Sequence, residues 1–434
     1  MAEPARVPPR ALAEPTQGGT SPVFVVGVAR SGTTLLAAML AAHPRLDCGP
    51  ESRFFARLRH LDRTARERLV DERLWPGPAL EFLASLDNQG RPIIDLFGLT
   101  PDEVRAWLAA RRPSIQAMLE SLVVQHAERR GKARWVEKTP RHLLVLDSLR
   151  QLWPDGRIVR IVRDPRDVAL SLAGMPFAGD SLVGNLVRID QDDRASRDFL
   201  ARDGRSFSLR YEDLVAEPER ELRRLCEFLG EAFEPAMLER GEAVEGVAAD
   251  HEWWKRSVSG PLDLSRMGRW PAAMPPDVQR FAALHLAEYL TEHGYPEPRP
   301  AAGRVAIVPV ADAVGARHED LLLGLARRDL VVERPAPRSA ADLRSQEGLI
   351  FMGVRGQLDP VRESAPLRRA ASLLLLAALL VERRASGRPV LWVARATTRA
   401  RRASDPGELL VVTLLRLLAR RVRPDRALDL LSRR

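Results

Sequence analysis

Short runs rich in Val, Ile and Leu alternate along the first part of the chain with longer segments of helical periodicity. The first pattern is typical of buried strands and the second of amphipathic helices. The predicted strands are Val23–Val28, Ala133–Val136, Arg157–Val162 and Ser206–Arg210. The predicted helices are Thr34–Ala42, Pro101–Arg129, Arg141–Leu152, Pro165–Leu172 and Pro218–Leu229. This alternation predicts an α/β fold, in which a three-layer parallel sheet carries helices on both faces.

A segment rich in proline and glycine, Gly294–Gly303, interrupts this pattern and is typical of a stiff linker. Beyond it a second alternation predicts a smaller C-terminal α/β domain. Its predicted strands are Arg304–Val308, Gly348–Val354 and Pro389–Val393, and its predicted helices are Glu319–Arg327, Ala365–Arg383 and Pro406–Arg420. The sequence thus predicts a disordered tail at 1–20, a main domain at 21–295, a linker at 296–303 and a C-terminal domain at 304–434.

The 434 residues carry a formal net charge of +9, which suits a polyanionic ligand, a nucleic acid or an acidic surface. Among 67 basic residues only Lys132, Lys138 and Lys255 are lysines, which makes each of them notable. Cys48 and Cys226 are the two cysteines, and they provide neither a disulfide framework nor a metal signature. The amino terminus lacks the apolar segment of a signal peptide, and the longest apolar run is too short to cross a bilayer. These features favour a cytoplasmic protein without a membrane partner.

The run Val23–Val28 leads into a loop with two glycines and then into a helical pattern. A strand, a glycine loop and a helix N-terminus form an anion site, because backbone N–H groups and the positive end of the helix dipole converge there. In the loop that binds nucleoside triphosphates, the last glycine precedes a lysine and a Ser or Thr. Here Thr33 and Thr34 follow Gly32, and the cation is Arg30, inside the loop. The loop therefore predicts a P-loop-like anion site without the usual lysine.

Three further segments place polar side chains after predicted strands. Arg163 lies at a predicted strand end, and Ser171 lies two turns into the helix that follows. Together they could bind a second phosphate; the alternative is a helix cap with surface charges. Lys138 could neutralise charge on a leaving oxygen, or else it pairs with Glu137 at the surface. Tyr211 is a weak signal, since an amphipathic residue at the sheet rim looks the same. Ligands of parallel sheets bind beyond the carboxyl ends of strands, so we expect these side chains to share one site.

These motifs, in this order, resemble the sulfotransferase superfamily, in particular the branch that holds tyrosylprotein sulfotransferases and many bacterial enzymes. The resemblance runs from about Pro22 to Gly294. It is carried by Gly27–Thr34, His43–Arg53, Glu137–Pro140, Arg163–Ser171, Tyr211–Leu214 and Gly268–Trp270. It implies sulfuryl transfer from the cofactor 3′-phosphoadenosine 5′-phosphosulfate (PAPS), which is released as 3′,5′-adenosine bisphosphate, with no metal required.

The resemblance also implies roles for individual residues. Arg30, Ser31, Gly32, Thr33 and Thr34 would hold the 5′-phosphosulfate, Arg163 and Ser171 the 3′-phosphate, and Tyr211 would be a further cofactor contact. Glu51 occupies the position of the family's proposed general base. Lys138 occupies the position of the lysine that assists the leaving group, and Arg30 would help to stabilise that group. An alternative for Glu51 is a carboxylate that stabilises a helix N-terminus. His142 and His251 are the reserve candidates for the base, whereas His43 is expected to be structural.

The sequence departs from that branch at several points. A serine that acts with the catalytic lysine falls at Gly268, so its role is absent or passes to Ser265 or Arg269. Cys48 matches a cysteine whose disulfide partner would fall near Val136, which fits a reducing compartment. The resemblance therefore does not identify the acceptor, and it does not imply sulfation of tyrosine. We expect a hydroxyl or an amine of a small molecule or of a carrier-bound intermediate, and no nucleic acid.

Two other functions remain as alternatives: an ATP-dependent small-molecule kinase with a degenerate phosphate loop, and a non-catalytic nucleotide-binding scaffold. The missing Gly-Lys pair and the lack of a paired-acid metal motif count against the kinase. In the C-terminal part, Gly348–Met352 and Pro389–Ala394 resemble the cofactor-free structural half of polyketide synthase ketoreductases. No dinucleotide-binding motif accompanies them, so we interpret this part as a structural module that docks a biosynthetic enzyme.

Overall fold

The computed structural model describes residues 21–179, 181–240, 246–247, 258, 260–299, 303–309, 323, 326, 330–333, 348–353, 390–394 and 420–422. The chain divides into two compact units. The first consists of Met1–Arg163 and Asp192–Met267, and the second of Asp164–Gln191 and Gly268–Arg434. Each unit has its own parallel sheet. The linker predicted at 296–303 and the domain division based on it stay predictions.

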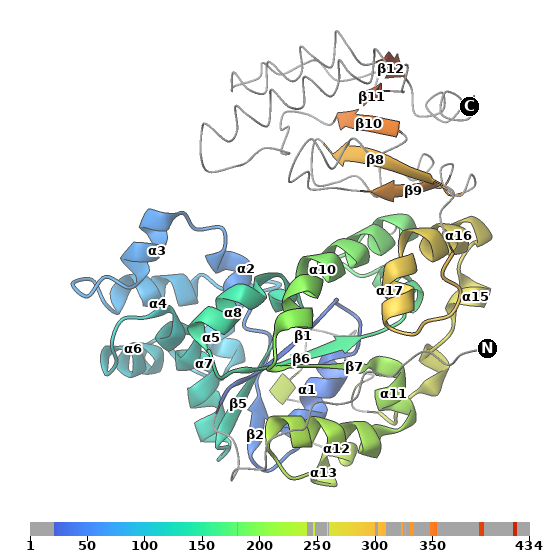
Figure 1. The fold of residues 1–434 in the computed structure, drawn as a ribbon. Helices are drawn as coiled ribbons and strands as arrows, with labels where there is room; N and C mark the ends of the chain where they lie inside the picture. Colours follow the sequence, from blue (N-terminus) through green and yellow to red (C-terminus); the bar gives the residue numbers. More distant parts are fainter. Residues whose placement is uncertain are drawn as a thin grey trace. The chain divides into compact units, whose positions relative to one another are not determined.

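A five-stranded parallel sheet forms the centre of the first unit (Figure 1). Its strands are β1 (Val23–Gly27), β2 (Leu46–Cys48), β5 (Arg134–Lys138), β6 (Arg157–Val162) and β7 (Ser206–Arg210). They lie in the order β2-β5-β1-β6-β7, and every neighbouring pair is parallel. The predicted parallel α/β sheet is confirmed, with all four predicted strands in it. The additional strand, β2, has only three residues, too few to show a periodicity.

The central strand of this sheet is β1, and the chain crosses from it to both sides. After β1 the chain forms β2 and β5 on one side and then moves to β6 and β7 on the other. The strand order therefore reverses beside β1. Open parallel sheets bind ligands beyond the carboxyl ends of their strands at such a point. The glycine loop that follows β1 lies at this place.

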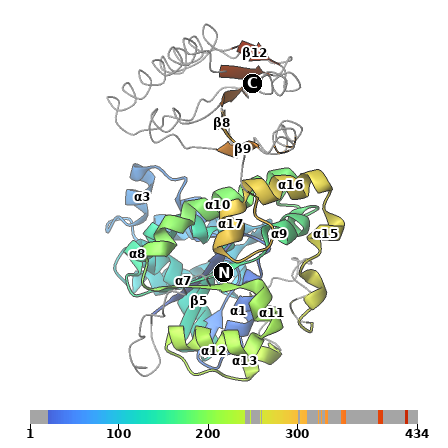
Figure 2. The same cartoon turned by 45° about the vertical axis from the view of Figure 1, so that its right-hand side comes forward.

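Different helices cover the two faces of the sheet (Figure 2). The main ones are α1 (Thr33–Ala41), α7 (Ile115–Arg129), α8 (Leu146–Leu152), α11 (Tyr211–Ala216) and α12 (Pro218–Leu229). Val25 of β1 belongs to one buried cluster with α1, α11 and α12. Phe24 points to the other face, where its ring centre lies 5.5 Å from that of Trp135 and 5.2 Å from that of Trp153, directly after α8. The first unit thus has the three layers that the sequence predicts.

Two predicted helices differ in detail from the structure. The single helix predicted over Pro101–Arg129 is two helices, α6 (Pro101–Ala109) and α7, because Pro113 interrupts the ladder and the Ser114 side chain caps α7. The helix predicted over Arg141–Leu152 begins with the 3₁₀ helix η1 (Pro140–Val145) and continues as α8.

The remaining elements of the first unit are short and surround the sheet. They are α2 (Phe54–Leu58), α3 (Arg63–Leu69), α4 (Gly77–Ala84), β3 (Asp87–Asn88), β4 (Arg91–Pro92), α5 (Ile93–Leu96), α13 (Ala236–Glu239) and η3 (Leu264–Arg266). The sequence did not predict the long helix α10 (Leu182–Arg202), which passes from the second unit into the first.

The second unit contains a helical part and a second parallel sheet. Its helices are α9 (Pro165–Leu172), the start of α10, α15 (Trp270–Ala273), α16 (Pro276–His285) and α17 (Ala287–Glu292). Its strands are β8 (Gly303–Pro309), β9 (Leu330–Glu333), β10 (Gly348–Gly353), β11 (Val390–Ala394) and β12 (Arg420–Val422), in the order β12-β11-β10-β8-β9. The three strands predicted for the C-terminal part are confirmed in type and place.

Several predicted features fall outside the described residues. They are the tail at 1–20, His251 and, apart from isolated positions, the three C-terminal helices. Among the helices that the structure describes, none is both long enough and apolar enough to cross a bilayer.

Candidate active site

One of the residues that the sequence analysis singled out lies at or shortly after the carboxyl end of each strand of the first sheet. Glu51 lies between β2 and α2, and Lys138 is the last residue of β5. Arg30 lies in the loop after β1, Arg163 directly follows β6, and Tyr211 opens α11 after β7. Along the edge of the sheet the order is therefore Glu51, Lys138, Arg30, Arg163 and Tyr211. A carboxylate and an amine lie on one side of the glycine loop, and a guanidinium and a phenol on the other.

The glycine loop has an unusual backbone that presents its amides to a ligand. Arg30 and Gly32 both have positive φ, +72° and +100°, the left-handed region that glycine tolerates best. Gly32 is the N-cap of α1 and has no side chain to occupy the first N–H groups of that helix. The hydroxyl of Ser31 is buried and has no hydrogen-bond partner among the described residues. These donors fit an anion seated on the loop.

Arg30 lies in cationic surroundings. Burial, together with the charges of Arg163 and Arg266, lowers the pKa of Arg30 to about 10. Tyr211 and Glu51 act in the opposite direction, but their effects are smaller. Like charges held together at a buried position raise the free energy of a protein, and a bound polyanion relieves that cost. The cluster Arg30, Arg163 and Arg266 is therefore suited to phosphate or sulfate groups.

Arg163 is fixed by contacts that leave its charge in this cluster. Its Nη1 donates to the carbonyl oxygen of Arg30 at 3.2 Å, and its Nη2 to that of Arg266 at 2.7 Å. Its guanidinium carbon lies 4.4 Å from the ring centre of Tyr211, a cation–π contact. The Tyr211 ring also covers Gly32, since a Cβ on Gly32 would lie 2.4 Å from its Cδ2. The structure thus brings together residues that follow β1, β6 and β7.

Glu51 and Lys138 form an ion pair on the other side of the loop. Lys138 Nζ lies 3.0 Å from Glu51 Oε1; the lysine side chain is fully buried, and that of Glu51 is 18% exposed. The alternative prediction, a surface Lys138 paired with Glu137, is therefore wrong. The first turn of α2 contains no acidic residue, so Glu51 does not act as a carboxylate of that turn. The pair thus places the Glu51 carboxylate, a proton acceptor that is accessible to solvent, next to the buried Lys138 ammonium.

The histidines considered as alternative bases have other surroundings. His142 is buried, and its Nδ1 lies 2.8 Å from Glu137 Oε2. His43 Nε2 lies 2.9 Å from the carbonyl oxygen of Ala232, and burial lowers the pKa of His43, which agrees with a structural role. Of the base candidates within the described residues, Glu51 is thus the one placed beside Lys138 at the sheet edge.

Two predicted residues are not brought to this group by the contacts of the first unit. Ser171 lies on α9 in the second unit, so its pairing with Arg163 stays a prediction. Ser265 is exposed, and its hydroxyl donates to Asp263 Oδ1 at 2.5 Å. The sequence analysis missed Arg266, whose charge acts on Arg30. The signal was there, because Arg266 directly follows Ser265 and lies just before Gly268–Trp270, which carries part of the resemblance.

The two cysteines, Cys48 and Cys226, are buried thiols. Burial raises the pKa of the Cys226 thiol to about 12, so this group stays protonated at neutral pH. Its Sγ lies 3.7 Å from Met237 Sδ within the hydrophobic core. Both side chains therefore act as packing residues.

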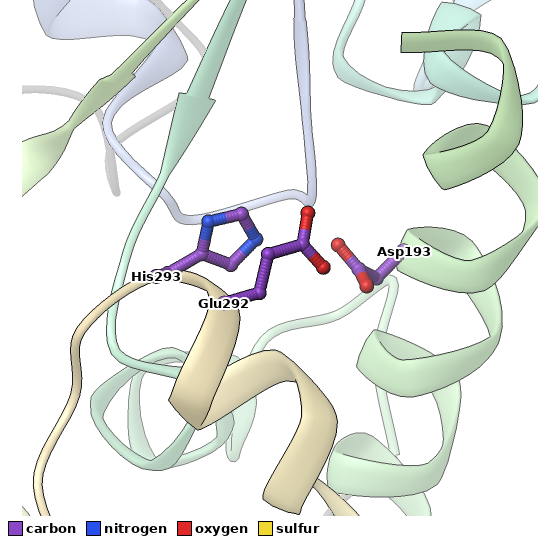
Figure 3. A group of neighbouring side chains, drawn as sticks. All are labelled: Asp193, Glu292 and His293. Atoms are coloured by element: carbon purple, nitrogen blue, oxygen red, sulfur yellow. The ribbon is translucent and has the colours of Figure 1, made fainter. Parts of the chain in front are cut away.

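Figure 3 shows a further set of acidic and histidine side chains, which come from different units. Asp193 lies on α10, where its carboxylate accepts hydrogen bonds from Arg160 and Arg197 of the same unit. Glu292 ends α17 and His293 follows it in the second unit, where the His293 ring contacts that of Tyr289. Because two arginines already balance the charge of Asp193, the set gives no argument for a metal ion.

Gly32→Ala is expected to lower the free energy of unfolding by about 1–3 kcal/mol and to abolish binding of a phosphate or sulfate group at the glycine loop. A Cβ at this position meets the Tyr211 ring at 2.4 Å, and φ of +100° is strained for alanine. Gly90→Ala is the matched control, since Gly90 has φ of +80° but no atom within 4 Å of an added Cβ. Chemical denaturation and calorimetry of both variants separate the backbone strain from the clash; equal effects in the two would contradict this account.

Comparisons with known proteins point to one family. The model of the sulfotransferase family matches residues 22–235. Protein-tyrosine sulfotransferase 1 of Danio rerio is 28% identical over 284 residues, which are 63% of this chain and 72% of that protein. The nodulation protein NoeE of Sinorhizobium fredii is 27% identical over 326 residues, 68% of this chain and 71% of that protein. The solved structure of the sulfotransferase domain from the curacin biosynthetic pathway covers 65% of this chain and 100% of its own, with 21% identity and a TM-score of 0.44. Residues 22–235 of this chain therefore belong to the sulfotransferase superfamily.

Proposed function

We propose that this sulfotransferase transfers the sulfuryl group of PAPS to a hydroxyl or an amine of its acceptor. The observation that carries the proposal is the 3.0 Å ion pair between Glu51, in the loop after β2, and Lys138, at the end of β5, on the sheet edge that also carries the glycine loop with Arg30. A base, a buried cation and an anion site at one sheet edge are the parts that an in-line transfer of a charged group requires.

The residues of the loop fit the donor end of PAPS. The buried Ser31 hydroxyl lacks a partner among the described residues, and the arginine cluster lowers the pKa of Arg30. Arg30, Ser31, Gly32, Thr33 and Thr34 would hold the 5′-phosphosulfate, while Arg163, Ser171 and Tyr211 would hold the 3′-phosphate and its nucleoside. When bound, PAPS supplies the sulfuryl group and an oxygen leaving group. We propose that no metal is required, because Arg30 and Lys138 provide the positive charge.

The chain's own residues would act on protons and charge. The Glu51 carboxylate would accept the proton of the acceptor hydroxyl or amine, which typically contributes ~10²–10⁴-fold to the rate. The Lys138 ammonium would stabilise the charge that develops on the leaving oxygen, with Arg30 beside it. Lys138 is the last residue of β5, which fixes it better than a loop alone would, and Glu51 lies in the short loop between β2 and α2.

For the acceptor we propose a small molecule or a carrier-bound biosynthetic intermediate. The names of the relatives favour a second candidate, a tyrosine of a protein, since several are protein-tyrosine sulfotransferases. A phenol such as 4-nitrophenol and a tyrosine peptide, each supplied with PAPS, would separate the two. For residues 304–434 we propose a docking role toward a biosynthetic enzyme. We propose that the protein acts in the cytoplasm and has neither a nucleic acid nor a membrane as a partner.

Calorimetry of the full chain tests the donor. We expect 3′,5′-adenosine bisphosphate to bind in a buffer with EDTA and MgATP to bind much more weakly, because the loop has Thr33 where a triphosphate loop has lysine. Tight binding of MgATP, with none of the bisphosphate, would favour the kinase alternative. Binding of the bisphosphate without sulfuryl transfer to any acceptor would favour the alternative of a non-catalytic nucleotide-binding scaffold.

A further inference from the structure

One buried carboxylate lies behind the ion pair of the candidate active site. We propose that Glu137 is a positioning residue that sets the distance and orientation between Glu51 and Lys138, and through them the rate of sulfuryl transfer. The effect on rate rests on the proposed function. The effect on the geometry of the pair concerns this chain's own residues alone.

Glu137 is almost completely buried and takes part in three hydrogen bonds. Ser52 Oγ donates to its Oε1 at 2.7 Å, and Thr139 Oγ1 donates to the same oxygen at 2.6 Å. His142 Nδ1 lies 2.8 Å from Oε2. Ser52 lies in the loop before α2, whereas Thr139 caps η1 and His142 lies within it, so one carboxylate joins the Ser52 loop to the chain that leaves β5.

The two residues of the ion pair are chain neighbours of this network. Ser52 follows Glu51, and Glu137 precedes Lys138. Successive side chains of a strand point to opposite faces, so Glu137 and Lys138 leave β5 on opposite sides. The network therefore holds the backbone on both sides of the pair without occupying the face where the pair lies. A shift of the Ser52 loop against β5 would lengthen or misalign the Glu51–Lys138 contact.

The loop that carries Glu51 needs such support, because its backbone is strained. Arg53 has φ of +50°, a left-handed conformation that costs a non-glycine residue roughly 1–2 kcal/mol. Its N–H donates to Thr139 Oγ1 at 3.2 Å, and the Phe54 N–H donates to Ser52 Oγ at 3.4 Å. The hydroxyls that bind Glu137 thus also accept from the backbone of the loop. Loss of the carboxylate would free both hydroxyls to turn away.

The charge of Glu137 makes this arrangement rigid. Burial raises the pKa of Glu137, but the charge of His142 and the hydrogen bonds from His142, Ser52 and Thr139 lower it by more. A buried carboxylate that keeps its charge strongly penalises the loss of any donor. A glutamine at this position would present an NH₂ group to one of the donors and leave it unsatisfied.

The same unit offers a matched control. Asp47 of β2 and His126 of α7 form a second buried pair, with Asp47 Oδ2 2.6 Å from His126 Nδ1. The side chains of both pairs are less than one-tenth exposed. Asp47 is not a chain neighbour of Glu51 or Lys138. Asp47→Asn therefore removes the same kind of interaction from the same sheet without touching the supports of the active pair.

The experiment compares Glu137→Gln, Ser52→Ala and Asp47→Asn in the full chain. The first readout is the side-chain NMR signal of Lys138 in protein labelled with [ε-¹³C]lysine. The chain contains only three lysines, so the spectrum is simple. Lys132→Arg and Lys255→Arg assign the signals. The second readout is kcat and KM for transfer from 4-nitrophenyl sulfate to 3′,5′-adenosine bisphosphate, which releases 4-nitrophenol. Thr139→Ser and Thr139→Val test rescue by a retained hydroxyl.

We expect Glu137→Gln and Ser52→Ala to shift the Lys138 signal and to lower kcat by roughly 10–100-fold with KM unchanged, as for a misplaced reacting group. Asp47→Asn should lower the melting temperature but leave kcat and the Lys138 signal as in the wild type. Thr139→Ser should keep the wild-type kcat, and Thr139→Val should not. If Glu137→Gln does not fold, the Lys138 signal and the kcat of Ser52→Ala and Thr139→Val test the inference.

An unchanged Lys138 signal together with unchanged kcat in Ser52→Ala and in the folded Glu137 or Thr139 variants would overturn the inference. A fall in kcat for Asp47→Asn equal to that for Glu137→Gln would reduce Glu137 to a general stabilising residue. Failure of the proposed function looks different. In that case the wild type would neither bind the bisphosphate nor transfer sulfate, while the Lys138 signal would still respond to Glu137→Gln.

Discussion

Glu51→Gln is expected to lower kcat for sulfuryl transfer by ~10²–10⁴-fold, the range that a positioned general base contributes. The amide keeps the shape of the side chain but accepts no proton. It also removes the negative charge that lies 3.0 Å from Lys138 Nζ. Arg30 and Arg163 lie on the far side of Lys138 along the sheet edge, so affinity for 3′,5′-adenosine bisphosphate should stay unchanged.

Steady-state kinetics and calorimetry on the same preparations check this expectation. The control is Glu67→Gln on α3, which removes a carboxylate from the same unit, where it pairs with Arg63 at 2.6 Å. That variant should keep the wild-type kcat, because the pair is exposed at the surface. A Glu51→Gln variant with the activity of the wild type would show that another group takes the acceptor proton. A variant that loses affinity for the bisphosphate would place Glu51 in the donor site instead.

The parts of this site that the sequence predicts are those that follow from strand order. Apolar runs mark where β1, β5, β6 and β7 end, and parallel strands bring their carboxyl ends to one edge. For that reason Arg30, Lys138, Arg163 and Tyr211 could be assigned to a common site before any contact was known. The glycine loop added its own signal, since a strand, two glycines and a helix in this order have few other uses.

The rest depends on contacts between residues far apart in the chain, for which the sequence has no periodic signal. The partner of Lys138 is Glu51 rather than its neighbour Glu137, because adjacent strand residues point to opposite faces. Arg266 reaches the Arg30 cluster from a segment that no apolar pattern marks. Many of the residues of α10 are polar or charged, so its apolar periodicity is weak, although it is a long helix.

Arg30→Gln is expected to separate the stability of the protein from its affinity for the donor. The folded protein lowers the pKa of Arg30 from its usual value to about 10, so the charged form is less favourable in the folded state than in the unfolded chain. Above about pH 10 the unfolded chain therefore binds more protons than the folded protein, so the cost is present in full below about pH 10 and disappears as the pH rises above it. At pH 7 the variant without its bisphosphate ligand should melt no lower than the wild type.

The same substitution should weaken ligand binding strongly. A hydrogen bond to a charged group contributes roughly 1.5–3 kcal/mol, so affinity for 3′,5′-adenosine bisphosphate should fall about 10–150-fold. A ligand at 100 times its Kd stabilises the wild type by about 2.7 kcal/mol, which raises the melting temperature by roughly 5–10 °C. At that concentration the variant should keep about a tenth to a half of this shift.

Thermal melts with and without the bisphosphate measure both effects in one series. Arg63→Gln is the control, because Arg63 is exposed and its hydrogen bond to Glu67 raises its pKa, the opposite of the shift at Arg30. That variant should keep the full ligand-induced shift. An Arg30→Gln protein that melts well below the wild type without ligand would mean that Arg30 stabilises the fold rather than the bound anion. A variant that keeps the full shift would place the anion away from the glycine loop, since Arg30 is the cation within it.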